Sequence, residues 1–101
     1  MGLLKLIGKI FAGGYTFPDG SRLMGDGRDA ELYIDPRGRR VSVQCELWDS
    51  ASGIERCIYA SSITRWLPPY DMEEIAENER QEIIEKISTL YRKTKTTFVV
   101  K

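Results

Sequence analysis

The chain begins with apolar residues at helical spacing and then changes to the two-residue alternation that is typical of strands. In residues 1–12, Leu3, Ile7 and Ile10 share one stripe and the lysines lie on another face, which predicts a short amphipathic helix. Residues 15–60 alternate apolar and polar positions between clusters of turn-forming residues. This second pattern predicts a series of antiparallel hairpins.

Turn residues divide the strand region into hairpins. Residues 18–20 read Pro-Asp-Gly between apolar neighbours, and residues 35–38 read Asp-Pro-Arg-Gly, a type I turn sequence. Residues 25–29 resemble a calcium loop or a phosphate cradle only superficially, and we interpret them as a plain loop. The strand after the second turn is expected to bury one face, made by Val41, Val43, Cys45 and Leu47.

The register of the next hairpin decides how the two cysteines are related. A four-residue loop over residues 50–53 pairs Cys45 near Ile58 and turns Cys57 to the opposite side of the sheet, so the two sulfurs cannot be joined. A loop one residue longer would place Cys45 opposite Cys57 but would mix polar and apolar residues on both faces. We favour the first register, free thiols and a reducing compartment.

The C-terminal third predicts a connector, a helix and a strand. Two consecutive prolines end the ladder, so residues 61–77 form a connector that is rich in proline and aromatic residues. Asn78 and Gln81 have the spacing of a capping box for a helix over residues 78–94. Strand-forming residues occupy positions 96–100. The buried stripe of the helix is expected to contain Ile83, Ile84, Ile87, Leu90 and Tyr91.

These elements predict one α+β domain over residues 1–101. An antiparallel β-meander would pack against one long C-terminal helix, with a short N-terminal helix and a final β-strand that returns beside an earlier strand. A chain of 101 residues is too short for two separate cores.

Composition excludes most catalytic chemistry and any global electrostatic attraction. The sequence has no histidine, which removes the commonest general base and the usual zinc and haem ligands. The 15 basic and 15 acidic residues balance, so we expect no nucleic-acid partner. No apolar run is long enough to span a bilayer, and we expect a cytoplasmic protein without metal or cofactor that is not an enzyme.

Acidic residues gather before and within the predicted helix, followed by basic ones. Either this surface engages a basic partner, or the charges complement the helix dipole, which also accounts for the basic half. Only the acids before the predicted cap escape the dipole explanation. The acidic series contains Asp71, Glu73, Glu74, Glu77, Glu79, Glu82 and Glu85.

Aromatic and basic side chains add three open alternatives. Trp66 and Tyr70, beside the prolines, form either a stiff contact surface or a lid on the core. Trp48 either packs under the N-terminal helix or is exposed to a partner. The arginines at the second hairpin tip, at positions 37, 39 and 40, either bind phosphate or are solvated turn residues, and we favour the latter.

The C-terminal half resembles a known family. Residues 65–71, Arg-Trp-Leu-Pro-Pro-Tyr-Asp, an acidic spacer, and the helix start at residues 78–87 are similar to small immunity proteins of bacterial polymorphic toxin systems, in particular the immunity protein 74 family. The similarity extends over residues 65–98. It implies an antiparallel sheet, one long helix, a final strand and a cognate toxin as partner.

The sequence therefore predicts an immunity-type protein that binds and neutralises a toxin. The alternative is a non-catalytic structural or adaptor module, which could be a homodimer or could approach a membrane through residues 3–11. We otherwise regard membrane contact as unexpected. The predicted partner-binding residues are Trp66, Tyr70, Asp71, Glu73, Glu74 and Glu77.

Overall fold

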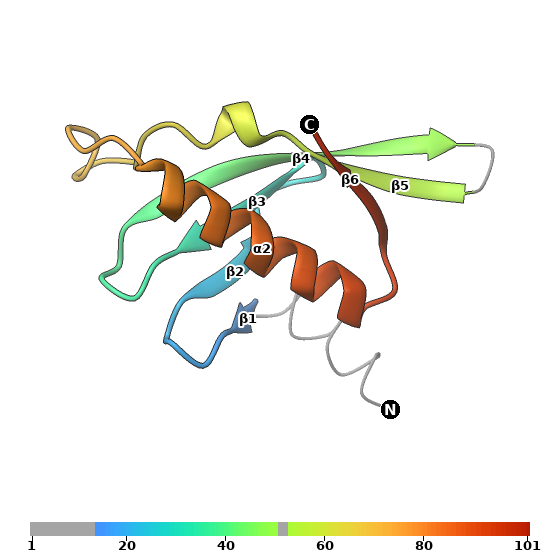
Figure 1. Ribbon diagram of the computed structural model, residues 1–101, viewed down its shortest axis with the longest axis horizontal. Helices are drawn as coiled ribbons and strands as arrows, with labels where there is room; N and C mark the ends of the chain where they lie inside the picture. The colour runs from blue at the N-terminus through green and yellow to red at the C-terminus, as the bar shows by residue number, and fades with distance from the viewer. Residues whose placement is uncertain (1–13, 51–52) are drawn as a thin grey trace.

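A computed structural model describes residues 14–50 and 53–101, which form a sheet covered on one face by a long helix (Figure 1). The predicted helix over residues 1–12 lies outside the described residues. A short 3-10 helix, η1 (Ala60–Ser62), follows β5, and the long helix α2 spans Glu77–Lys93. The strands are β1 (Tyr15–Thr16), β2 (Arg22–Gly25), β3 (Ala30–Ile34), β4 (Arg40–Ser50), β5 (Gly53–Ile58) and β6 (Thr97–Val100).

The six strands lie in the sheet in chain order. All pairings from β1 to β5 are antiparallel, as the predicted meander requires, whereas β5 and β6 are parallel. The parallel pair arises because the connector and α2 carry the chain back to the end of the sheet where β5 begins (Figure 1). The fold is α+β as expected, but its sheet is mixed because of the last strand.

The pairing of β4 with β5 confirms the predicted register. Ser50 pairs with Gly53 and Cys45 pairs with Ile58, while Cys57 lies opposite Glu46. Successive residues point to opposite faces of a sheet, so the two cysteines lie on different faces. Both are free and fully buried.

The core lies between α2 and the face of the sheet that it covers. From α2 it receives the predicted stripe, in which Ile83, Ile87 and Leu90 are at most 1% exposed. From β4 it receives Val41, Val43 and Cys45, the face expected to be buried. Leu47, the fourth residue of that expected face, is only half-buried.

Strand β3 turns its more polar residues toward the helix. Glu31 and Tyr33 are buried, whereas Leu32 and Ile34 on the other face are only half-buried. Two of the polar atoms have partners on α2: the Tyr91 hydroxyl donates to Glu31 Oε1 at 3.1 Å, and Lys86 Nζ donates to the Tyr33 hydroxyl at 3.1 Å. These bonds offset the cost of removing polar groups from water. Glu31 Oε2 is buried and has no hydrogen-bond partner among the described residues.

The N-cap of α2 lies two residues earlier than the capping box predicts. Its N-cap is Ala76, whose backbone is extended and whose N–H donates to Glu79 Oε1 at 3.0 Å. Asn78 lies in the first turn, so the prediction of Asn78 as N-cap was wrong. The buried side chain of Ile75, just before the cap, fixes where the chain enters the helix. Gln81 bonds to the Glu77 side chain instead of reaching back to residue 78.

Candidate functional site

The connector between η1 and α2 projects from one end of the molecule as a loop that is held at both ends (Figure 1). Trp66 and Ile75 flank the loop, and their side chains are 2% and 4% exposed. Arg65 and Glu74, each one residue before these anchors, form an antiparallel bridge, and the Ile75 N–H donates to the Thr64 carbonyl at 2.9 Å. We call residues 67–74 the connector tip.

Backbone hydrogen bonds give the connector tip a defined shape. The Tyr70 N–H donates to the Leu67 carbonyl and the Glu73 N–H donates to the Tyr70 carbonyl, both at 3.0 Å. The Leu67 N–H donates to the Arg40 carbonyl at 2.7 Å and so ties the tip to β4. The tip exposes 87% of Met72 and 36% of Leu67, two large apolar side chains in a largely acidic surface.

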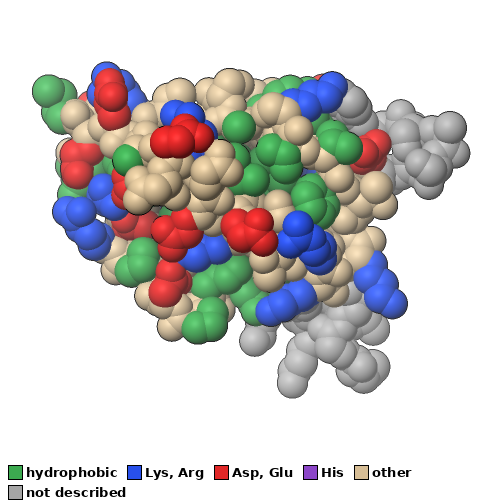
Figure 2. All heavy atoms as spheres, viewed as in Figure 1, with side chains coloured by type: hydrophobic (Ala, Val, Ile, Leu, Met, Phe, Trp, Pro, Cys, Tyr) green, Lys and Arg blue, Asp and Glu red, His purple; other side chains and the backbone are tan. Residues whose placement is uncertain are grey.

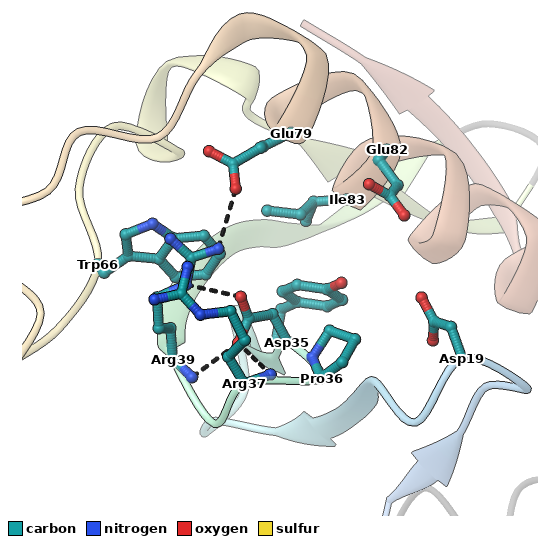
Figure 3. A pocket seen from close by; sticks show the side chains of 10 residues that line it. Asp19, Asp35, Pro36, Arg37, Arg39, Trp66, Glu79, Glu82 and Ile83 are labelled. Atoms are coloured by element: carbon teal, nitrogen blue, oxygen red, sulfur yellow. Dashed lines mark hydrogen bonds and ion pairs between the residues drawn. The ribbon is translucent and has the colours of Figure 1, made fainter.

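Arg39 joins the connector tip, the second hairpin and α2 through its guanidinium (Figure 3). Its Nε donates to Asp35 Oδ2 at 2.7 Å, its Nη2 to Glu79 Oε2 at 3.0 Å and its Nη1 to Glu73 Oε1 at 3.3 Å. The guanidinium carbon also lies 4.3 Å from the centre of the Trp66 ring. Burial opposes the charge of Arg39, but the hydrogen bonds and charges of Asp35 and Glu79 outweigh this and raise its pKa.

Arg39 is neither a phosphate-binding residue nor a solvated turn residue, the two alternatives that the sequence left for the arginines at positions 37, 39 and 40. Arg37 and Arg40 are exposed, as solvated turn residues are, but Arg39 is 7% exposed and fully engaged by carboxylates. A signal was present in the sequence: Asp35 stands four residues before Arg39 across a tight turn. The partners Glu73 and Glu79 are more than thirty residues away, and only the fold brings them together.

The structure brings most of the predicted partner-binding residues onto one surface. Asp71, Glu73 and Glu74 are exposed on the connector tip, Glu77 begins α2, and Tyr70 is half-buried. Glu74 pairs with Arg65 at 3.2 Å and Glu77 pairs with Arg80, whereas Asp71 forms no ion pair with any residue that the structure describes. Figure 2 shows acidic side chains grouped over the connector and the beginning of α2.

The helix dipole accounts for part of the acidic series, as the second interpretation requires. Glu77 and Glu79 lie in the first turn of α2, and Arg92 and Lys93 lie in the last turn. Glu82 pairs with Lys86 at 3.4 Å and Glu85 pairs with Arg92 at 3.3 Å. The carboxylates that precede the helix are those the dipole does not explain.

Trp66 is placed as in the core-lid alternative. Its ring lies in the core, and its indole Nε1 has no hydrogen-bond partner among the described residues. The ring supports the connector tip from below by stacking on Arg39. The side chain of Trp48 lies outside the part of the structure that is described.

Two further properties bear on the type of site. Among residues 14–50 and 53–101, no three cysteine or acidic side chains lie close enough together to hold a metal ion. In the same ranges, no helix has the length and apolar character needed to cross a bilayer.

The family model described as Immunity protein 74 matches residues 27–101, which is more than half of the chain. The chain belongs to the immunity protein 74 family. The match includes β3 to β6, the connector and α2, and so contains the whole candidate site. No curated protein and no solved structure matches the chain.

Proposed function

We propose that this protein neutralises a cognate bacterial toxin by direct contact in the cytoplasm, with the connector tip at the centre of the interface. Membership in an immunity protein family supports a toxin partner in general. We choose this surface mainly because Met72 is 87% exposed on a loop whose backbone is internally hydrogen-bonded. A preformed loop loses little conformational entropy when it binds.

The chemistry of the tip suits a basic partner surface with an apolar centre. Methionine packs against irregular apolar surfaces because its side chain is unbranched and flexible. The carboxylates of Asp71, Glu73 and Glu74 lie on the same exposed loop and would attract a positively charged toxin over long distances. Tyr70 and Glu77 would contribute at the rim, while Trp66 would act mainly by holding the tip in position.

The direct test is binding of the purified protein to the toxin encoded by the neighbouring gene. We expect Asp71→Lys and Met72→Ala each to weaken the complex by about tenfold or more, which is the scale of an interface hot spot. Neither substitution removes a side-chain ion pair found in the described structure. The association rate of the unchanged protein should also fall steeply as salt is added.

Lys95→Glu is the matched control. Lys95 is equally exposed but lies just beyond the other end of α2, so this charge reversal should leave the affinity unchanged. Loss of affinity with Lys95→Glu but not with Asp71→Lys would move the interface away from the connector tip. Absence of any complex with the neighbouring gene product would contradict the proposed function itself.

A further inference from the structure

A pocket of about 280 Å³ lies beside the connector tip, between the two hairpin turns and the first half of α2 (Figure 3). Its apolar lining comes from Tyr33, Pro36, Trp66 and Ile83. Pockets for small molecules usually have about 300–1,000 Å³, so this one lies at the small end of that range and has room for one long side chain. Pro36 is exposed, whereas Tyr33, Trp66 and Ile83 are at most 3% exposed, so Pro36 is the apolar wall that a partner can contact.

The charges that line the pocket are mainly negative. Four carboxylates, from Asp19, Asp35, Glu79 and Glu82, face two guanidinium groups, from Arg37 and Arg39. Lys86 lies next to the pocket and bonds to Asp19. The net charge of the groups around the pocket stays negative when Lys86 is counted with them. Asp19 accepts hydrogen bonds from Lys86 and from Ser21. These bonds, the one from Lys86 most strongly, lower the pKa of Asp19 to about 2, so its carboxylate is ionised at neutral pH.

Glu82 is the carboxylate with most capacity left for a partner. Asp35 and Glu79 already accept hydrogen bonds from Arg39, and Asp19 accepts them from Ser21 and Lys86. Among the residues that the structure describes, Glu82 pairs only with Lys86, at 3.4 Å, and its side chain is 60% exposed. Figure 3 shows the Glu82 and Asp19 carboxylates facing each other at one end of the pocket, with Arg39 and Trp66 closing the other end.

We infer that this pocket receives a basic side chain of the toxin, lysine or arginine, whose charged end bonds to Glu82 and whose aliphatic stem lies on Pro36. The inference rests on the proposed function and names a recognition subsite for it. A long basic side chain matches a pocket with apolar walls and an acidic end because its methylene groups pack while its charge is paired. Glu79 and Arg39 belong both to the pocket and to the support of the connector tip, so one partner surface could engage both.

The test does not require the toxin. The full chain, labelled with ¹⁵N, is titrated with N-acetyl-arginine amide, with N-acetyl-lysine amide and with N-acetyl-aspartate amide while amide shifts are recorded by NMR. We expect saturable shifts at Tyr33, Glu82 and Ile83 with the two basic probes only. Glu82→Gln should weaken this binding by about fivefold or more, since a charged hydrogen bond is lost. Glu85→Gln, three residues further along α2 and 69% exposed, should not change it.

Two outcomes would overturn the inference. One is the absence of saturable shifts with the basic probes, and the other is stronger binding of the aspartate probe, which would assign the pocket to an acidic side chain held by Arg37. If the basic probes bind as expected, the toxin complex is measured with Glu82→Gln, and unchanged toxin affinity would refute use of the pocket by the toxin. Failure of the unchanged protein to bind the toxin would instead refute the proposed function, with the probe result intact.

Discussion

The guanidinium carbon of Arg39 lies 4.3 Å from the centre of the Trp66 ring, so a buried cation and a buried aromatic ring meet beneath the connector tip. The same guanidinium bonds to carboxylates from the second hairpin, the connector and α2. The planar guanidinium, with its five N–H donors, can bond to three carboxylates that lie in different directions at once. Arg39 therefore links the part of the molecule proposed to bind the toxin with the part that folds around the core.

Arg39→Met should destabilise the protein strongly. The substitution leaves the Asp35 carboxylate, whose side chain is 7% exposed, without its cation, and breaking a buried pair in this way costs about 3–5 kcal/mol. The free energy of unfolding in urea measures the loss. Arg37→Met, at an exposed neighbouring position, should change it by no more than about 0.5 kcal/mol. A loss below about 1 kcal/mol for Arg39→Met would show that the buried pairs contribute little.

Asp19 should make the protein less stable in acid. Its pKa in the folded state is about 2, against an ordinary value of 3.8, because the bonds from Lys86 and Ser21 favour the carboxylate. The resulting stabilisation is fully present above pH 4 and disappears as the pH falls toward 2. Its size should not exceed about 1 kcal/mol, because the Asp19 side chain is 40% exposed. Urea unfolding of Asp19→Asn should differ from the unchanged protein at pH 6, and the difference should shrink as the pH falls through the folded pKa of about 2.

Glu31 should have the opposite pH dependence. Burial under α2 raises its pKa above the ordinary 4.5, although the bond from Tyr91 and the charge of Arg56 oppose this. The folded state therefore holds the proton more tightly than the unfolded chain, so the free energy of unfolding falls as the pH rises from 4.5 through the folded pKa. Glu31→Gln should remove this slope. An identical slope in the variant would mean that another group titrates there.

Neither cysteine should react while the protein is folded. Cys45 and Cys57 are both fully buried, and burial raises the pKa of Cys45 to about 12, so almost no thiolate forms there at neutral pH. An aromatic disulfide reagent should detect no thiol in the native protein and two thiols in denaturant. Rapid reaction of one thiol without denaturant would indicate local opening of the β4–β5 hairpin.

The hairpins could be predicted from sequence because their signals are local. The turn at residues 35–38 and the alternation after it determine which residues of β4 are buried, and the same alternation selected the register of β4 with β5. The parallel placement of β6 depends on how α2 crosses the sheet, which no local pattern encodes. The helix start was misplaced because Ala76 caps through its backbone and Glu79, and alanine carries no capping signal of its own.

The candidate site was predictable only in part. Exposed acids before a helix suggested a partner surface, and Asp71, Glu73 and Glu74 are on one loop. The burial of Arg39 and the pocket beside it depend on residues 19, 35, 66, 79 and 82 meeting in space, and they come from separate elements. Trp66 illustrates the difficulty, because the same aromatic residue fits a contact surface or a core until its burial is known.

At the connector tip, the residues that hold the loop in the fold are different from those that we propose to contact the toxin. Trp66 and Ile75 hold the ends of the loop in the core, while Met72 and Asp71 between them are exposed. Substitutions at these exposed positions leave the anchors and the helix cap in place. Under the proposed function, such an arrangement would let substitutions at the exposed positions change which toxin is bound, while the residues that hold the loop in the core stay the same.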